Sequence, residues 1–334
     1  MTRRSRDAAG AGAPGGPPPA PHPDLPEDSV ARTRRGILFI LAGMFAISVN
    51  DATIKALSGD YPLHQMVFTR SAIALVFSFV FLRLEGGLVL LRTATPLLHL
   101  VRALFIVVAN MTFFAALAVL PLAEATAVFF VAPLLITLLS IPVLGERVGP
   151  RRLAAIAAGF LGVLVMLRLG AAPRADAPPV WALALPLAAA AAYAGMQVLT
   201  RKLGVASRAS AMAIYIQTTF LIVSAAFFLV AGDGRFAAAT DNPALQFLLR
   251  AWVWPERQDW PLFLLIGVMG GGIGYCLSQA YRLGNAATIA SYEYVALPLA
   301  IFWGWAIWGD VPGPRTMLGI ALIVGAGLYV FLRE

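Results

Sequence analysis

Charged residues lie inside apolar stretches of this sequence, where a charge needs a partner or a function. Asp51 and Lys55 are four residues apart, which places them on one face of a helix, and Arg70 follows in the next apolar stretch. If the two stretches run antiparallel, these three residues form one charged cluster. The cluster either contacts and gates a polar solute or acts as a salt bridge that fixes helix packing.

Glu293 is the second candidate, because this carboxyl lies between Tyr292 and Tyr294 in a late apolar stretch. A carboxyl group held away from water favours its neutral form, so Glu293 is able to take up and release a proton. The alternative is a permanently protonated glutamate that is hydrogen-bonded between helices. Glu124 is instead expected to interact with the positive end of a helix dipole.

Neutral polar and aromatic side chains accompany these charges. Amides and a hydroxyl able to hydrogen-bond a solute are Asn50, Asn110, Gln197, Gln217, Ser278 and Gln279. Rings able to stack on a solute are Tyr275, Tyr281, Tyr292, Tyr294 and Trp303. The alternative for each of these residues is a structural role, in which the side chain joins two helices instead of contacting a solute. Arg102 is expected to extend toward lipid headgroups.

The composition indicates that helices in a lipid bilayer position these residues. Of the 334 residues, 60% are apolar and 13% are charged, whereas about a quarter are charged in soluble proteins. Ten stretches are long enough to cross a bilayer as a helix. They are 36–57, 63–83, 97–117, 122–143, 152–169, 180–199, 211–231, 260–281, 286–308 and 316–332. The predicted fold class is an all-α integral membrane protein with ten transmembrane helices.

A repeated motif divides the chain into two halves. Gly145-Glu146-Arg147-Val148-Gly149-Pro150-Arg151 returns as Gly309-Asp310-Val311-Pro312-Gly313-Pro314-Arg315. Each half then holds five helices, and an odd number inverts the second half relative to the first. The predicted units are a disordered tail over residues 1–35, one repeat over 36–169 and another over 180–334, with a longer loop at 232–259.

The distribution of basic residues predicts the orientation. With the N-terminus inside, sixteen Lys and Arg residues are expected on the cytoplasmic side of the membrane. The outer side would receive only six: Arg168, Arg174, Arg235, Arg250, Arg257 and Arg315. This asymmetry favours cytoplasmic termini and explains the net charge of +8 without a nucleic-acid partner.

The remaining motifs exclude other chemistry. One cysteine and three dispersed histidines predict neither a metal site nor a cofactor. The glycines between Gly267 and Gly274 precede no lysine, so they predict close helix packing rather than a phosphate loop. Gly159 and Gly162, with Gly319 and Gly325, predict packing of the fifth and tenth helices against each other or in a homodimer.

The chain resembles a known family of membrane proteins. Ala115-Ala116-Leu117, Pro121-Leu122-Ala123-Glu124-Ala125, Pro133 and Gly145-Glu146-Arg147 are similar to the EamA domain of the drug/metabolite transporter superfamily, and 280–334 is similar to a second copy. The second copy departs from the pattern, with Asp310 for glutamate. Within the family, Asp51, Lys55, Tyr61-Pro62 and Phe68-Thr69-Arg70 resemble a subgroup that includes riboflavin and S-adenosylmethionine carriers.

The resemblance implies a transporter of small metabolites in the bacterial inner membrane rather than an enzyme. We expect a secondary active carrier that works by alternating access with proton coupling. Flavins, nucleoside-like cofactors, aromatic amino acids and amphipathic drugs all remain as candidate solutes. The alternatives are a passive solute channel and a membrane-embedded enzyme acting on lipid-linked substrates.

Overall fold

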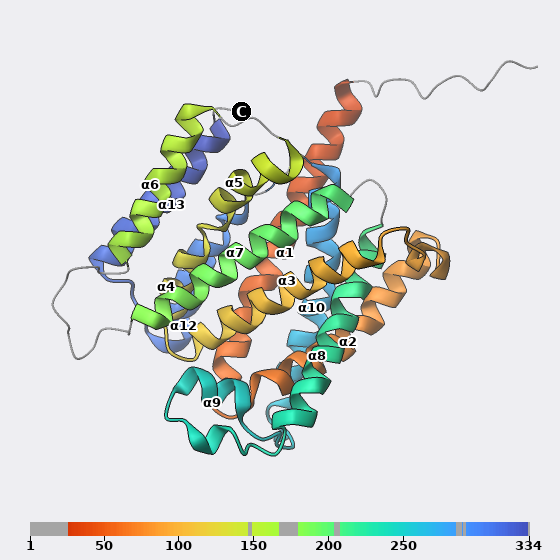
Figure 1. Ribbon diagram of the computed structural model, residues 1–334, viewed down its shortest axis with the longest axis vertical. Helices are drawn as coiled ribbons and strands as arrows, with labels where there is room; N and C mark the ends of the chain where they lie inside the picture. The colour runs from red at the N-terminus through yellow and green to blue at the C-terminus, as the bar shows by residue number, and fades with distance from the viewer. Residues whose placement is uncertain are drawn as a thin grey trace, which may run out of the picture.

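The computed structural model describes residues 26–145, 149–166, 180–203, 208–284, 289 and 292–332. Every regular element among them is a helix (Figure 1). Several predictions fall outside these residues: most of the expected tail (1–25), residues 146–148 of the first motif copy, and residues 286–288, 290 and 291 of the ninth stretch.

The helices follow the apolar stretches of the sequence. They are α1 (Pro26–Leu57), α2 (Leu63–Glu85), α3 (Pro96–Leu117), α4 (Leu122–Phe129), α5 (Ala132–Leu144), α6 (Pro150–Met166), α7 (Val180–Leu203), α8 (Ala209–Ala231), α9 (Pro243–Leu249), α10 (Trp260–Leu283), α12 (Ala296–Trp308) and α13 (Pro314–Leu332), with short 3₁₀ turns at Leu88–Leu91 and Ala237–Ala239. The first helix begins at Pro26 rather than at Gly36, so it includes the end of the segment expected to be a tail.

The lengths agree with an integral membrane protein. Among the described residues, seven helical spans are long and apolar enough to cross a membrane, and α4 with α5 counts as one of them. Shorter apolar segments lie in α6, α12 and α13. Large apolar side chains also cover much of the outer surface, such as those of Val76, Ile222 and Leu229. Such a surface suits lipid rather than water.

Two helix breaks occupy matching positions before the two motif copies. The fourth stretch is interrupted at Phe130, because Pro133 has no N–H to donate to the carbonyl of Phe129. Pro298 has the same effect on Tyr294, just before α12. Phe130 and Tyr294 each precede the first glycine of their motif copy by fifteen residues, and their rings meet with centroids 5.5 Å apart. The fourth and ninth stretches are therefore discontinuous helices rather than the continuous ones expected.

The first glycines of the two motif copies end their helices in the same way. Gly145 has φ 72° and Gly309 has φ 71°, which is the left-handed conformation that favours glycine. The repeated sequence thus produces a repeated local structure.

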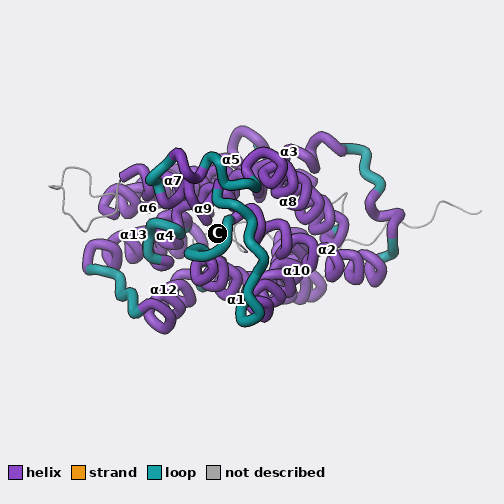
Figure 2. The backbone as a smooth tube through the Cα atoms, turned by 90° about the horizontal axis from the view of Figure 1, so that it is seen from below, coloured by secondary structure: helices purple, strands orange, loops and turns teal. Residues whose placement is uncertain are grey.

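Helices α6 and α13 pack side by side along one edge of the molecule (Figures 1 and 2). A Cβ atom on Gly162 would lie 2.8 Å from the carbonyl oxygen of Gly319, and one on Gly319 would lie 2.9 Å from that of Gly162. The helix backbones therefore touch where both side chains are hydrogen. Thr316 adds a hydrogen bond from α13 to Glu124 in the first turn of α4, with 3.1 Å between Oγ1 and Oε1.

The segment from Gly232 to Asp259, which we call the outer loop, contains α9 and covers the corner between α1 and α2 (Figure 1). Gln65 binds the loop backbone twice: its Nε2 donates to the carbonyl of Val253 at 2.6 Å, and its Oε1 accepts from the N–H of Val253 at 3.1 Å. Arg250 donates to the carbonyls of Ser58 and Gly59. The loop is therefore attached to the corner through many polar contacts.

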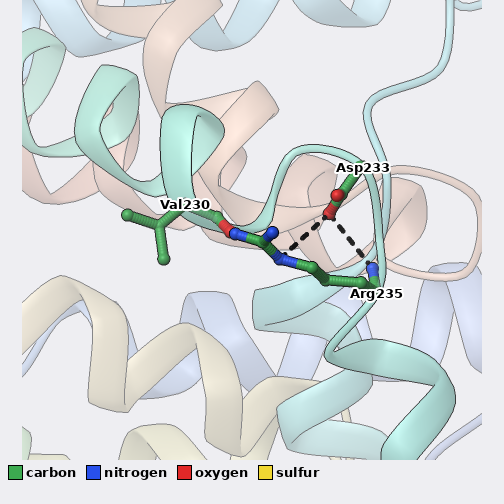
Figure 3. A network of polar contacts seen from close by, with 3 residues as sticks. All are labelled: Val230, Asp233 and Arg235. Atoms are coloured by element: carbon green, nitrogen blue, oxygen red, sulfur yellow. Dashed lines mark hydrogen bonds and ion pairs between the residues drawn. The ribbon is translucent and has the colours of Figure 1, made fainter.

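Other charges of the outer loop make weak contacts. Arg235 donates to the carbonyl of Val230, and its Nε lies 3.7 Å from Oδ1 of Asp233 (Figure 3). More than half of each charged side chain is exposed, so water screens this ion pair. The pair shapes the start of the loop and contributes little to stability.

Tyr61 provides a test of the attachment of the outer loop. Its buried hydroxyl donates to Oδ2 of Asp259 at 2.6 Å and accepts from the N–H of Glu256 at 3.0 Å. We expect Tyr61→Phe to cost about 1–3 kcal/mol, because two partners lose their contact. The variant should melt at a lower temperature and lose the outer loop faster to protease. Trp254→Phe, at a mostly exposed side chain, is the control, and equal behaviour of the two variants would contradict the prediction.

The same contact should survive at alkaline pH. Burial, with a further contribution from Asp259, raises the pKa of Tyr61 above its usual value. A raised folded-state pKa means that the stabilisation is present below the ordinary tyrosine pKa of about 10 and is lost only as the pH rises through the higher value. Protease resistance of the loop should therefore persist at about pH 10.

Candidate functional site

A cavity of about 150 Å³ lies in the centre of the helices, between α1, α2, α3, α4, α7, α8, α10 and α12. Polar lining residues are Ser48, Asn50, Asp51, Arg70, Arg102, Asn110, Thr126, Tyr193, Gln197, Thr200, Gln217, Ser278 and Glu293. Phenylalanines complete the wall: Phe113, Phe114, Phe129, Phe130 and Phe220. Hydrogen-bonding groups and ring faces are thus available to one small molecule.

Helical periodicity brings these residues together. On α3 the lining positions include 102, 106, 110 and 113, and on α7 they are 193, 196, 197 and 200. Residues three or four apart share one helix face, so each helix presents a single stripe to the cavity. The opposite stripes pack against neighbouring helices or face outward.

Asp51 and Arg70 lie on this cavity, as expected for the charged cluster. Their charges are close enough to interact, and Asn50 donates to Oδ1 of Asp51 at 3.0 Å. Arg70 donates from Nη2 to Oδ1 of Asn110 at 2.9 Å, and its guanidinium lies 5.0 Å from the ring of Phe220. The arginine is 6% exposed. This group can hold the polar edge of a solute beside an aromatic face.

Lys55 is not part of that group. Its Nζ donates to the carbonyl oxygens of Leu117 at 2.9 Å and Leu120 at 2.7 Å, and it lies 5.4 Å from the ring centre of Trp308. Lys55 therefore caps the C-terminal end of α3, where a cation is favourable. The spacing from Asp51 was compatible with pairing, but free carbonyls at a helix end were closer to the long side chain.

Glu293 forms a second polar group on the cavity. Its Oε1 accepts from Tyr281 at 2.5 Å and from Tyr193 at 2.9 Å, while Gln197 donates to the hydroxyl of Tyr193 at 2.6 Å. Only 1% of Glu293 is exposed. A buried carboxyl with two hydroxyl donors can exist with or without its proton, which suits proton exchange.

Glycines allow α10 to approach this wall closely. A Cβ on Gly270 would lie 3.0 Å from Cγ of Arg70, and one on Gly267 would lie 2.5 Å from Cβ of Ile73. Gln217 donates to the carbonyl of Gly270 at 3.1 Å. The expected packing role of these glycines agrees with this contact between α10 and α2.

Several predicted site residues lie outside the cavity lining: Tyr275, Gln279, Tyr292, Tyr294 and Trp303. Trp303 reaches it indirectly, since its Nε1 donates to Ser48 at 3.2 Å.

Tyr275 and Gln279 belong to a separate polar group centred on Glu85, at the end of α2. Gln279 donates to Glu85 at 2.8 Å and to Tyr275 at 2.9 Å, and the Ser210 hydroxyl donates to Glu85 at 2.6 Å. This group joins α2, α8 and α10 at the end of the bundle away from the outer loop.

Sequence reasoning missed or misplaced five polar lining residues. Ser48, Thr126, Tyr193 and Thr200 were not identified, because single polar residues in an apolar run carry little signal. Arg102 was expected to reach the headgroups, but it is 2% exposed and lines the cavity. Its spacing from Asn110, two helical turns along α3, was the available signal that both share one face.

Comparisons with known proteins identify similar chains. The model of the EamA-like transporter family matches residues 34–168. The riboflavin transporter of Rhizobium johnstonii is 30% identical over 90% of this chain and 91% of its own length. The pseudopaline exporter of Pseudomonas aeruginosa is 27% identical (88% and 94%), and the S-adenosylmethionine uptake transporter of Rickettsia prowazekii is 24% identical (92% and 96%).

A solved crystal structure has the same fold. It superposes with a TM-score of 0.63 at 22% identity, and the match covers 91% of this chain and 98% of the other.

Proposed function

Because the chain belongs to the EamA-like transporter family, we propose that it is a secondary active carrier of a small, ring-containing organic solute. The observation that carries the proposal is the central cavity, where charged and amide groups face phenylalanine rings. Relatives named for riboflavin and S-adenosylmethionine transport make flavins and nucleoside-like molecules the first solutes to test.

The proposed mechanism is alternating access between two inverted five-helix halves in the bacterial inner membrane. Matching helix breaks and matching left-handed glycines support the repeat. Contact between the equivalent residues Phe130 and Tyr294 is what a two-fold axis through the cavity wall would produce. The basic residues favour cytoplasmic termini, which would place the outer loop outside the cell.

Proton coupling is assigned to Glu293, and solute recognition to Asp51 and Arg70. Glu293 is buried, borders the cavity and is held by two hydroxyls. Asp51 and Arg70 lie in the same cavity, so solute and proton can influence each other without direct contact.

Counterflow in vesicles tests the function. Purified carrier is reconstituted with unlabelled riboflavin inside, and labelled riboflavin is added outside. A carrier should show saturable uptake that the internal solute accelerates, and an imposed pH gradient should then drive accumulation. Uptake that neither saturates nor responds to internal riboflavin would contradict a riboflavin carrier, and the same assay would then be run with S-adenosylmethionine.

Asp51→Asn tests solute recognition. The amide keeps the shape of the side chain but removes the charge that interacts with Arg70. We expect solute uptake to fall by about tenfold, or ~1.4 kcal/mol, because a buried cation loses its counter-charge. Asp60→Asn, the same substitution at an exposed position, is the control. Normal uptake at normal abundance in the membrane would remove Asp51 from the site.

A further inference from the structure

Arg102 is a buried cation whose position the charged cluster does not explain. It lies on α3 near the end of the cavity away from the outer loop, and only 2% of it is exposed. Its Nε donates to Oγ1 of Thr200 at 2.5 Å, and its Nη1 approaches the carbonyl of Met212 at 3.5 Å. The contact to Met212 is at the limit of a hydrogen bond, so most of the donor capacity of Arg102 remains available.

The two cavity arginines differ in their counter-charges. Arg70 interacts with Asp51. Within the described part of the chain neither arginine has a carboxylate within ion-pair distance, but Asp51 lies near enough to Arg70 to favour its charge, and no carboxylate does so for Arg102. Glu293 is engaged by Tyr193 and Tyr281. A buried charge without an opposite charge raises the free energy of the folded protein. A ligand that supplies the opposite charge removes part of this penalty and binds more tightly.

The geometry separates two ends of the cavity. Arg102 and Asn110, the partner of Arg70, are eight residues apart on α3, which corresponds to about 12 Å along the helix. The Thr200 hydroxyl accepts from Nε of Arg102 and donates to the carbonyl oxygen of Met196 at 2.8 Å. Thr200 therefore holds the guanidinium by one edge and leaves the Nη edge for a ligand.

We propose that Arg102 binds an oxyanion of the transported solute, a phosphate or carboxylate group, at this end of the cavity, with Thr200 as its positioning residue. This proposal rests on the proposed carrier function and extends it: the ring-containing solute would also carry an anionic group. The solute would then lie between Phe113, Phe114 and Phe220 with its anionic group toward Arg102. A guanidinium suits this role because its planar donors match an oxyanion.

Inorganic phosphate tests the anion site without a known solute. The full-length carrier in detergent is heated with increasing phosphate, and chloride at the same ionic strength serves as the reference. Phosphate should raise the melting temperature saturably in the wild type and in Arg315→Gln, which changes an exposed arginine. The shift should vanish in Arg102→Gln and remain in part in Arg102→Lys. No shift in the wild type, or an equal shift in Arg102→Gln, would overturn the proposal.

Thr200→Val provides the test if Arg102→Gln fails to fold. It keeps the guanidinium but removes the acceptor of Nε, so the phosphate shift should weaken. An unchanged shift in a folded Thr200→Val variant would contradict the positioning role.

Paired flavins connect the anion site to transport. Riboflavin and riboflavin 5′-phosphate are compared as competitors in counterflow, since they differ by one phosphate group. Arg102→Gln should weaken the phosphorylated competitor by about tenfold and riboflavin much less. Equal losses would indicate a merely structural arginine. If neither flavin competes in the wild type, flavins are excluded as solutes while the phosphate shift still decides the role of Arg102.

Discussion

Glu293→Gln should abolish accumulation of the solute against its gradient while counterflow continues. The substitution is nearly isosteric, and both tyrosine hydroxyls donate to Oε1, which the amide oxygen can replace. The hydrogen bonds that hold the side chain are therefore retained. What the amide loses is the ability to gain and release a proton, which net proton-driven transport requires.

The measurement compares two assays on one vesicle preparation. With an imposed pH gradient, the ratio of internal to external solute should fall to about one in Glu293→Gln, because only downhill equilibration remains. Counterflow, which needs no net proton movement, should stay close to wild type. Glu256→Gln, on the exposed outer loop, is the matched control. Undiminished accumulation in Glu293→Gln would show that the acid is structural.

Gly162→Ala and Gly319→Ala should strongly destabilise the contact between α6 and α13. At each position the new methyl group would lie under 3.0 Å from the other glycine's carbonyl oxygen. A backbone atom cannot rotate away as a side chain can, so the helices must separate. Overpacking of this kind costs about 1–3 kcal/mol for each substitution.

The matched control is Gly325→Ala on the same helix α13. A Cβ there meets no atom within 4 Å, so this variant should gain helix propensity without a clash. Melting of the purified carrier should therefore move in opposite directions for Gly319→Ala and Gly325→Ala. Equal melting temperatures would contradict the packing assigned to Gly319.

Sequence patterns predicted those parts of the fold that depend on local physics. Apolar run length predicted the helices, and the two copies of the repeated motif share a left-handed glycine, at Gly145 and Gly309. Pro133 and Pro298 could have predicted both helix breaks. The apolar residues continue across each break, however, so each stretch was expected to be one continuous helix. Charge in apolar sequence drew attention to Asp51, Arg70 and Glu293, and the structure places all three on one cavity.

Side-chain direction could not be predicted with the same success. Lys55 binds the carbonyls at the end of α3 rather than Asp51, and this contact depends on how α3 packs against α1. Arg102 turned inward because Thr200 on α7 offers an acceptor. The neighbours in both cases are distant in sequence, and one sequence without its tertiary contacts does not reveal them.

The outer loop affects the relative populations of the two end states of the proposed transport cycle in the absence of solute. In an inverted repeat, exchange of the two halves converts one end state into the other, so a symmetric chain would populate both states equally. Only features found in one half create a free-energy gap between them. The connection between α2 and α3, at the matching place in the first half, is shorter than the outer loop. In the proposed cycle, the contacts of Tyr61, Gln65 and Arg250 with that loop would contribute to the gap if only one end state makes them. Each such contact, at about 1 kcal/mol, changes the population ratio about fivefold.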